Sequence, residues 1–350
     1  MKSVELFAGA GGLAMGVGLA GFEPFVVVER DRWACDTIRE NRDRGYPLVK
    51  AWNVHEGDVR EFDWTNTGED IDLVAGGPPC QPFSMGGKHG AYGDERDMFP
   101  ATVEIVRKLR PRAFLVENVK GLTRSSFANY YQYILLQLSF PGIVRHGRET
   151  WLDHFRRLQQ EKASGNAIGK DIAYNVIPTL VNAADHGIPQ RRERVFIVGF
   201  RSDLDVEWSF PRPTHDLDAL LHDQWISGAY WERHDIRAPP VPEKFIPKIR
   251  GLSQDLFPPN MLPWRTTRDA MVGLPDPEVL AEQAISDHRF QPGARTYPGH
   301  TGSPLDLPAK TLKAGDHGVP GGENMLVRDD GSIRYFTIRE AARLQTFPDG

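Results

Sequence analysis

Short apolar runs alternate with amphipathic segments along the first 200 residues of the chain. Five apolar runs bounded by glycine, proline or acidic residues predict buried β-strands at 4–8, 25–29, 71–75, 113–117 and 195–200. Residues 32–41 and 98–108, between these runs, have the apolar spacing of helices. Strands that alternate with helices predict an α/β fold with a mostly parallel, doubly wound sheet covered on both faces. Ligands are then expected at the carboxyl ends of the strands.

The pattern weakens in the second half of the chain. Residues 140–172 predict a polar, helical insertion, and repeated prolines interrupt the periodicity between 201 and 305. The sequence therefore predicts a large α/β domain with a second, smaller and irregular domain.

Composition narrows the class of protein. The chain has 350 residues, 40% of them hydrophobic, which suffices for a sizeable core. Glu5 and the glycines after it interrupt the N-terminal apolar region that a signal peptide needs, and no apolar run approaches the roughly 18 residues of a membrane span. We expect a cytoplasmic protein. The two cysteines cannot form a disulfide framework, and no Cys and His cluster has the spacing of zinc ligands.

The charge is unevenly distributed. Residues 1–100 hold 10 Lys and Arg against 17 Asp and Glu, whereas the remainder holds 32 against 30. The later part of the chain is thus able to present basic faces, although a short basic run is more often a solvated surface than a binding site.

A glycine-rich turn follows the first predicted strand. Gly9, Gly11 and Ala14 fit the pattern G-x-G-x-x-G/A, and Glu29 stands 20 residues after Gly9 at the end of the second strand. Such glycines let the backbone approach a nucleoside, and the carboxylate accepts hydrogen bonds from ribose hydroxyls. An adenosine cofactor is expected; NAD and S-adenosylmethionine both fit, and a purely structural turn is the alternative.

Asp58, in the segment GDVREFD, is the next acidic candidate. It can accept a hydrogen bond from the adenine amino group, or it can serve as a turn or cap residue.

The third predicted strand leads into GGPPCQPFS, which contains Cys80. Prolines on both sides restrict the backbone around this thiol, which favours a positioned nucleophile over an incidental cysteine in a rigid turn. Cys35 lies on an amphipathic helix and is interpreted as a small buried hydrophobe. Glu117 and Asn118 end the following strand, so the carboxylate either faces Cys80 across the sheet edge or caps the next segment.

The run QRRER precedes the last predicted strand. Alternate residues of a strand share a face, so Arg192 and Arg194 can point the same way, where arginines suit an anion or a carbonyl oxygen.

Taken together, these segments resemble the DNA (cytosine-5-)-methyltransferase family of the bacterial restriction-modification type. FAGAGG, Glu29, PPCQPFS, ENV, QRRERVFIVG and RYFTIREAARLQTFPD occur in the order and spacing of that family. The resemblance covers 1–200 and about 305–349. It implies a Rossmann-like catalytic domain at 1–200, a target-recognition domain at 201–305, and a return to the catalytic domain at 306–350.

The resemblance also implies a reaction. A cytosine flipped out of a specific site in double-stranded DNA would receive a methyl group on C5 from S-adenosylmethionine, through a covalent adduct between Cys80 and C6. Glu117 would hold N3 and the exocyclic amine, and Arg194 would bind O2, with Arg192 and Gln190 near it.

The remaining site residues are carried over from the same family motifs. Those expected to bind the cofactor are Phe7, Gly9, Ala10, Gly11, Gly12, Glu29, Asp58, Val59 and Pro78. Those expected to contact DNA are Ser84, Lys88 and Arg96, in a glycine-rich loop, and Thr311.

One departure from the family bears on the cofactor pocket. In relatives, a segment after the RLQTFPD motif completes that pocket, and this sequence stops at Gly350. The expectation is either a truncated product or a second polypeptide that supplies the segment.

Three other functions stay open on the sequence. A nicotinamide-dependent oxidoreductase gives no role to PPCQPFS, ENV or QRRER; an RNA cytosine-5 methyltransferase shares the core; a non-catalytic relative would not need Cys80, Glu117 and Arg194. The sequence leaves the recognition site undefined and does not decide whether a cognate restriction endonuclease exists. Seven cations at 201–305 are candidates for DNA contacts that position alone does not sort: Arg233, Arg237, Lys244, Lys248, Arg250, Arg265 and Arg268.

Overall fold

The computed structural model describes residues 1–65, 70–79, 97–164, 171–279, 285–298, 301–313 and 324–349. The chain forms two compact units. Unit 1 comprises Met1–Leu180 and Arg194–Phe210, and unit 2 comprises Val181–Glu193 and Pro211–Gly350. Each unit is described by itself.

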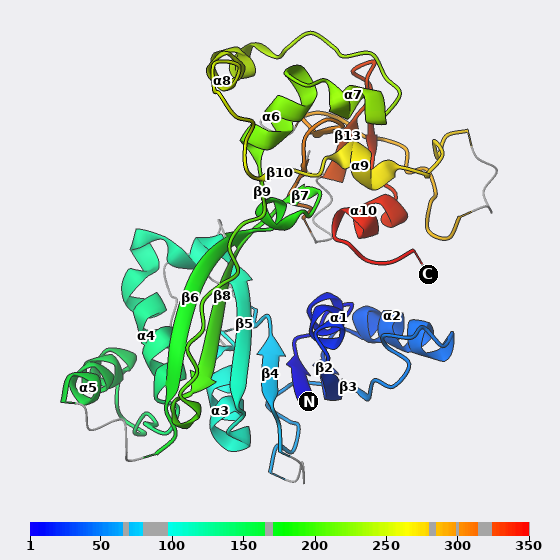
Figure 1. Ribbon diagram of the computed structural model, residues 1–350. Coiled ribbons are helices and arrows are strands. Elements are labelled where there is room, and N and C mark those ends of the chain that lie inside the picture. Colours follow the sequence, from blue (N-terminus) through cyan, green and yellow to red (C-terminus); the bar gives the residue numbers. More distant parts are fainter. Residues whose placement is uncertain are drawn as a thin grey trace. The chain divides into compact units, whose positions relative to one another are not determined.

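The centre of unit 1 is a seven-stranded sheet with the order β3-β2-β1-β4-β5-β8-β6 (Figure 1). The strands β1 to β5 pair in parallel, and β8 pairs antiparallel with β5. The prediction of a mostly parallel α/β sheet is confirmed. The strand bounds are β1 Lys2–Leu6, β2 Glu23–Glu29, β3 Val54–Glu56, β4 Leu73–Gly76, β5 Ala113–Val119, β6 Tyr174–Asn182 and β8 Glu193–Arg201.

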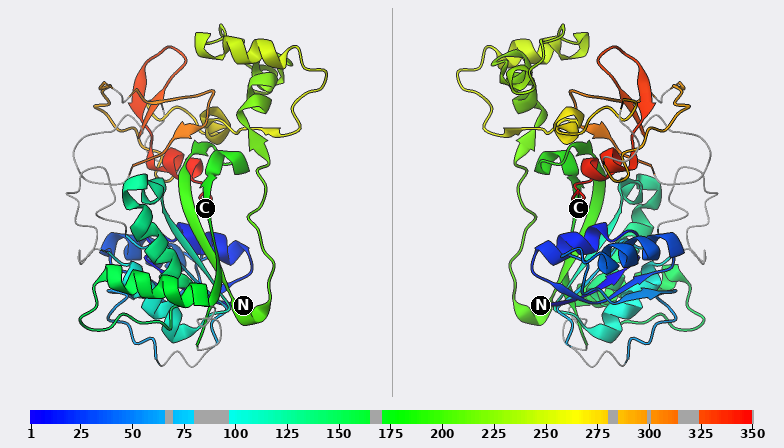
Figure 2. Two further views of the ribbon diagram at one scale, coloured as in Figure 1. Left: turned by 90° about the vertical axis from the view of Figure 1, so that its left-hand side faces the viewer. Right: turned by 90° about the vertical axis from the view of Figure 1, so that its right-hand side faces the viewer.

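Helices cover both faces of this sheet. The helices α1 and α2 lie on one face, and α3, α4 and α5 lie on the other, as the two opposite views of Figure 2 show. The helical insertion expected at 140–172 is α5, which packs on α4. The helix bounds are α1 Gly12–Leu19, α2 Arg32–Asp43, α3 Phe99–Leu109, α4 Ala128–Ser139 and α5 Trp151–Ser164.

The two faces of the sheet bury separate apolar clusters. Val26 and Val28 of β2 join the cluster beneath α3 and α4, whereas Val27 between them packs with Ile38 of α2. Because successive side chains of a strand point to opposite faces, an uninterrupted apolar run such as FVVV identifies a strand buried on both sides. Because β1, β2, β4 and β5 are buried on both faces and pair in parallel, their carboxyl ends lie along the same edge of the sheet.

Unit 2 is built from short elements. Its helices are α6 Leu217–Trp225, α7 Ala229–Arg233, α8 Ile246–Leu252, α9 Thr267–Met271 and α10 Ile338–Leu344. Its strands are β7 Gln190–Arg191, β9 His215–Asp216, β10 Leu262–Pro263, β11 Ser303–Pro304, β12 Ala309–Lys310, β13 Met325–Val327 and β14 Ile333–Tyr335. The second, irregular domain that the proline pattern predicts is present here.

The C-terminal part of the chain packs within unit 2. Leu326, Phe336 and Leu344 share a buried apolar cluster with Ala270 of α9. Residues 306–350 therefore belong to the same compact unit as 211–305. The division by role into catalytic and target-recognition parts stays a prediction.

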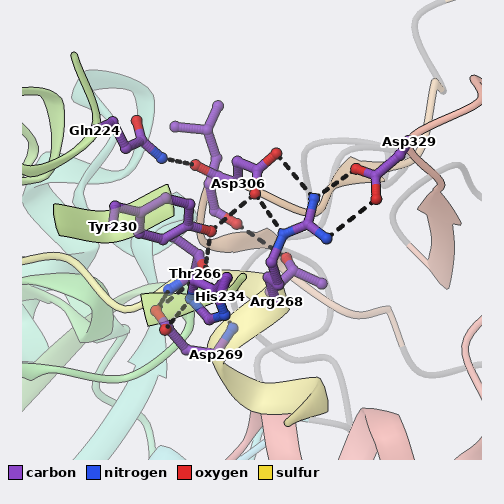
Figure 3. Close-up of polar contacts among 10 residues, drawn as sticks. Gln224, Tyr230, His234, Thr266, Arg268, Asp269, Asp306 and Asp329 are labelled. Carbon is purple, nitrogen blue, oxygen red and sulfur yellow. Dashed lines mark hydrogen bonds and ion pairs between the residues drawn. The ribbon is translucent and has the colours of Figure 1, made fainter. Parts of the chain in front are cut away.

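A polar network connects several elements of unit 2 (Figure 3). The carboxylate of Asp306 accepts hydrogen bonds from Tyr230 Oη at 2.8 Å and from Arg268 Nε at 2.6 Å. The same guanidinium donates to Asp329, and Thr266 Oγ1 lies 2.9 Å from Tyr230 Oη. This network links α7, α9 and the loops beside β11 and β13 where unit 2 has no extended sheet.

Candidate active site

The turn after β1 carries the first group of predicted cofactor residues. Phe7, Gly9 and Gly11 all have positive φ angles, of 53°, 54° and 88°. Gly11 is the N-cap of α1, and a Cβ atom on it would lie 2.7 Å from Cζ3 of Trp52. The left-handed backbone and this close approach both explain why glycine is required at residue 11. The exposed Ala10 and Gly12 flank it.

The carboxylate of Glu29 fixes the position of this turn. Its Oε2 accepts a hydrogen bond from Gly9 N at 2.7 Å, and its Oε1 accepts from Arg30 N and Asp31 N at 2.7 and 2.8 Å. The ends of β1 and β2 are thereby held together. A carboxylate offers about four acceptor positions, so one position on Oε2 stays available.

Asp58 and Val59 follow β3. The Asp58 carboxylate accepts from Arg60 Nε at 2.9 Å and from the Arg60 backbone N at 2.9 Å. The hydrogen bond from the Arg60 side chain lowers the pKa of Asp58. Val59 is buried in the main core, and its carbonyl accepts from Trp64 Nε1 at 2.7 Å. Asp58 thus caps a turn in this structure, which agrees with one of its two sequence interpretations.

The segment that leads to Cys80 leaves the sheet between β1 and β5. Gly76 at the end of β4 pairs with Leu6 on one side and with Val116 on the other. The buried Pro78 is held by Asn118, whose Nδ2 donates to the Pro78 carbonyl at 3.1 Å. The PP and ENV motifs, 40 residues apart, therefore meet at the carboxyl edge of the sheet, as their positions after neighbouring strands predict.

Glu117 lies at the same edge, beside the backbone of Gly77. A Cβ atom on Gly77 would come within 3.2 Å of Glu117 Oε2, so any larger residue would displace the carboxylate. Glu117 Oε1 also forms an ion pair with Arg194 Nε at 2.7 Å. Arg194 is placed by the antiparallel pairing of β8 with β5, in which it stands opposite Val119.

The Glu117–Arg194 pair is only partly buried. The side chains retain 26% and 17% of their exposure, respectively. Their polar ends are therefore open to solvent or to a ligand while the strands beneath them are buried. The pair presents an acceptor and a donor together, which is suited to a planar heterocycle with adjacent donor and acceptor groups.

Cys80, Ser84, Lys88 and Arg96 lie outside the described residues, but both ends of that segment are anchored. Pro78 is bound by Asn118, and Asp97 accepts hydrogen bonds from Tyr130 Oη of α4 and from Phe99 N. Neither Asp97 nor Tyr130 is among the site residues predicted from the sequence. Asp97 lies two residues before α3, and an aspartate near the start of a predicted helix is a signal that could have identified it.

The other predicted residues belong to unit 2. Gln190 is fully buried in β7, and its side-chain amide has no hydrogen-bond partner among the described residues. Arg192 is partly buried, and its carbonyl accepts from Ala183 N. The Thr311 hydroxyl donates to the Arg191 carbonyl at 2.6 Å, beside the β7–β12 pairing. Within unit 2 the structure thus brings Gln190, Arg192 and Thr311 to one region.

The described part of the chain contains no cluster of three or more His, Cys, Asp or Glu side chains that would hold a metal ion. In the same part of the chain, no helix is both long enough and apolar enough to span a membrane.

Comparison with known proteins identifies the family to which the chain belongs. The profile of the C-5 cytosine-specific DNA methylases matches residues 1–143 and 163–350. The chain belongs to this family, and its enzyme class is DNA (cytosine-5-)-methyltransferase. The residues between the two matched parts, 144–162, include most of α5.

The relatives are modification enzymes of type II systems. The chain is 29% identical over 347 residues to the type II methyltransferase M.PspPI of Psychrobacter sp., which covers 99% of this chain and 70% of that protein. It is 32% identical over 300 residues to M.AquIA of Picosynechococcus sp., with 82% of this chain and 96% of that protein covered. The S. pombe Dnmt2 methyltransferase has the same fold, with a TM-score of 0.53 at 15% identity over 100% of this chain and 87% of that one.

Proposed function

We propose that this enzyme transfers a methyl group from S-adenosylmethionine to C5 of a cytosine flipped out of a specific double-stranded DNA site, through a covalent bond between Cys80 and C6. The observation that carries this proposal is that the PP and ENV motifs meet Arg194, the last residue of QRRER, within unit 1. Asn118 holds Pro78, and Glu117 pairs with Arg194 beside Gly77, three residues before the thiol.

The residues after β1 fit the adenosine part of the cofactor. Glu29 has an acceptor position left for a ribose hydroxyl after its three backbone hydrogen bonds. A Cβ atom on Gly9 would meet nothing within 4 Å, so there is open space beside the turn. When bound, S-adenosylmethionine supplies an electrophilic methyl group. Phe7, Gly11, Asp58 and Pro78 are proposed to complete its binding site.

The proposed chemistry begins with the thiolate of Cys80. Its sulfur forms a bond to C6 of cytosine, and the C5–C6 π electrons then make C5 nucleophilic. Glu117 holds N3 and the exocyclic amine, while the Arg194 guanidinium donates to O2 and stabilises the charge that develops on the ring. Transfer of the methyl group to C5 would break its bond to the sulfonium and leave S-adenosylhomocysteine. A base then removes the C5 proton, and the electron pair of that C–H bond re-forms the C5–C6 double bond and expels the thiolate. The cytosine is thereby restored to aromaticity and the enzyme to its starting state.

Cys35 offers a matched control for the proposed nucleophile. It is fully buried in α2, and burial raises the pKa of its thiol to about 11, so it stays protonated near neutral pH. Its position and protonation state both exclude it from the reaction proposed for Cys80.

The test measures transfer of tritium from labelled S-adenosylmethionine to unmethylated bacterial DNA. The wild-type enzyme and the Cys35→Ser variant are expected to label DNA. Cys80→Ala is expected to reduce the rate at least about 10⁴-fold, as in other enzymes whose nucleophile is removed. Label transfer that survives Cys80→Ala would remove the thiol from the mechanism. A parallel reaction with transfer RNA separates DNA from RNA substrates.

A second measurement tests the covalent bond directly. The substrate is DNA in which 5-fluorocytosine replaces cytosine. Its C5 carries fluorine instead of the proton that a base removes, and fluorine cannot leave as a cation, so the covalent adduct cannot break down. The wild-type enzyme should therefore accumulate as a denaturant-stable protein–DNA complex, and Cys80→Ala should not. Bisulfite sequencing of DNA from a host that expresses the enzyme would then locate the methylated cytosine and define the site.

A further inference from the structure

The basic residues of unit 2 are concentrated in one segment. Residues 201–305 hold 11 Lys and Arg against 15 Asp and Glu, yet residues 237–268 within them hold six against two. A DNA-contacting surface in this acidic region therefore has to be local, and 237–268 is the part whose charge is complementary to phosphate.

The structure separates six of the seven cations that position in the sequence could not sort. Arg268 is bound to Asp306 and Asp329, Arg233 to Asp223, and Lys248 to Asp218. These three have acidic partners within the unit. Their positive charges are already compensated, which leaves less for an external phosphate.

Three exposed cations beside α8 are different. Lys244 lies two residues before the helix, Arg250 lies in it, and Arg265 lies two residues after β10. Across the described residues, no acidic side chain forms an ion pair with any of them, although Glu243 and Asp255 are near in sequence. The positive charge of Arg265 contributes, after burial, to the lowered pKa of His215, which pairs with Leu262. Arg265 therefore lies near the base of the loop that follows α8.

That loop exposes two large apolar side chains. Leu256 retains 93% of its exposure, the highest value among large hydrophobic residues of the described chain, and Phe257 retains 80%. Pro258 and Pro259 follow directly and restrict the backbone of the loop. Apolar side chains held in water on a proline-stiffened loop lose little conformational freedom on binding.

Both ends of the loop are anchored. Ser253 N donates to Ile249 O at the end of α8, and Leu262 N donates to Thr214 O where β10 joins β9 (Figures 1 and 2). The apolar tip thus has a fixed base, with Arg250 before it and Arg265 after it in the chain. We refer to Lys244, Arg250, Leu256, Phe257 and Arg265 as the α8 surface.

We propose that the α8 surface contacts duplex DNA, with its three cations on phosphates and with Leu256 and Phe257 in a groove against the bases. This inference rests on the proposed function, because it assigns the substrate contact of the same enzyme. Proteins that read or bend DNA insert leucine, phenylalanine and proline between or against base pairs, flanked by cations on the backbone. Two side chains are too small for a self-association interface, which needs about 800 Å² per partner.

The test measures binding of a fluorescent pool of 30-base-pair random-sequence duplexes over a range of salt concentrations. Leu256→Ala with Phe257→Ala is expected to weaken binding about tenfold, since apolar contacts to bases contribute on this scale. The salt dependence of that variant should stay that of the wild type. In the variant Lys244→Gln, Arg250→Gln and Arg265→Gln, the slope of log K against log salt should become shallower by about 0.9 for each phosphate that is no longer neutralised.

Two control variants make the same kinds of substitution outside the α8 surface. Val279→Ala removes an apolar side chain that is 85% exposed in unit 2, and Lys50→Gln removes an exposed cation in unit 1. Both should bind DNA as the wild type does. Hydrogen exchange of unit 2 should be unchanged in the Leu256→Ala, Phe257→Ala variant because neither side chain is packed.

The outcomes separate this inference from the proposed function. If the wild type labels DNA and both α8 variants bind it with unchanged affinity and slope, the α8 surface does not bind DNA, whereas the methylation function stands. Loss of self-association in sedimentation velocity without loss of DNA affinity would also overturn the inference. If the wild type transfers no label but the α8 variants weaken DNA binding, the α8 surface is confirmed as a DNA-binding surface and the methylation proposal fails.

Discussion

The two units bury their polar groups in different ways. Unit 1 has one large apolar cluster that runs through β1, β2, β4 and β5 into α3 and α4, and six of its described polar side chains are buried. Unit 2 is smaller, yet ten of its described polar side chains are buried. Several of these belong to ion pairs and capping boxes, such as Arg334 with Glu340 and Thr337.

The difference concerns the interactions that hold each unit in its shape. A sheet with double burial fixes strand ends rigidly, and unit 1 uses those ends to hold Pro78, Glu117 and Arg194. Unit 2 has short elements that a hydrophobic core alone does not define, so directional hydrogen bonds specify its shape. Disrupting one polar group should therefore affect unit 2 as strongly as a large cavity affects unit 1.

The largest effect is expected for Glu340→Ala in unit 2. Glu340 accepts hydrogen bonds at 2.6 Å from both terminal nitrogens of Arg334 and at 2.9 Å from Thr337 N. Its removal leaves a buried guanidinium without its carboxylate partner and removes the side-chain half of the α10 capping box, which should lower the free energy of unfolding by about 5 kcal/mol. Hydrogen exchange mass spectrometry should show faster exchange in β14 and α10 and unchanged exchange in the sheet of unit 1.

The double variant Arg334→Met, Glu340→Leu is the control for this change. An apolar pair of similar volume leaves no unpaired charge, so its loss of stability should be much smaller than that of Glu340→Ala. Equal destabilisation by the single and double variants would show that the ion pair itself, rather than the orphaned charge, supplies the stability.

The matching change in unit 1 is Phe114→Ala. Phe114 is fully buried in β5, packs against Tyr174 with the ring centroids 5.1 Å apart, and fills the space beside Gly199. The cavity should lower the free energy of unfolding by about 4 kcal/mol. Urea unfolding measures the loss, and faster exchange confined to β4, β5 and β8 would locate it. An effect below that of Ile134→Val in the same core would contradict the view that apolar volume holds this unit.

The same contrast explains what could be predicted from the sequence. The five strands expected in unit 1 are confirmed because each is an apolar run between breakers. The strand β6 is not predictable in this way because YNVIPTLVN contains polar residues and Pro178. It lies at the edge of the sheet, where a proline is tolerated.

The site was only partly predictable, because the order of the motifs does not specify the contacts between their side chains. Motif order brings Pro78, Glu117 and Arg194 to one sheet edge, but it does not show that Glu117 binds Arg194. In unit 2, apolar periodicity carries little information. The capping boxes Thr266 to Asp269 and Thr337 to Glu340 are readable as T-x-x-D and T-x-x-E, whereas their partners across the unit are set by tertiary contacts alone.

Glu5 is a buried carboxyl group within the apolar sheet of unit 1. It is buried in β1, and burial raises its pKa to about 7 despite a hydrogen bond from Ser3 Oγ at 2.6 Å. The folded state thus holds this proton more tightly than the unfolded state, so stability is full below about pH 4.5 and is lost as the pH rises toward 7. Above that range the cost is about 3 kcal/mol.

The variant Glu5→Gln should remove this pH dependence. Its free energy of unfolding, from urea titrations between pH 5 and pH 8, should exceed that of the wild type at pH 8 and approach it at pH 5. Ser3→Ala removes the hydrogen bond that lowers the pKa of Glu5, so the loss of stability in this variant should extend to higher pH and become larger in total than in the wild type. Parallel pH profiles for the wild type and Glu5→Gln would show that Glu5 does not titrate in this range.

The smallest effect on the free energy of unfolding is expected for an exposed ion pair on the surface. Lys108 and Glu104 on α3 form an ion pair at 2.8 Å between positions i and i+4, with 35% and 51% of their side chains exposed. Because solvent and salt screen such a pair, Lys108→Gln should change the free energy of unfolding by about 0.5 kcal/mol or less. Thermal denaturation at low and high salt measures it, and the difference between variants should vanish at high salt. A loss comparable with that of Glu340→Ala would mean that exposed and buried ion pairs contribute alike, and the contrast between the two units would then not follow from burial.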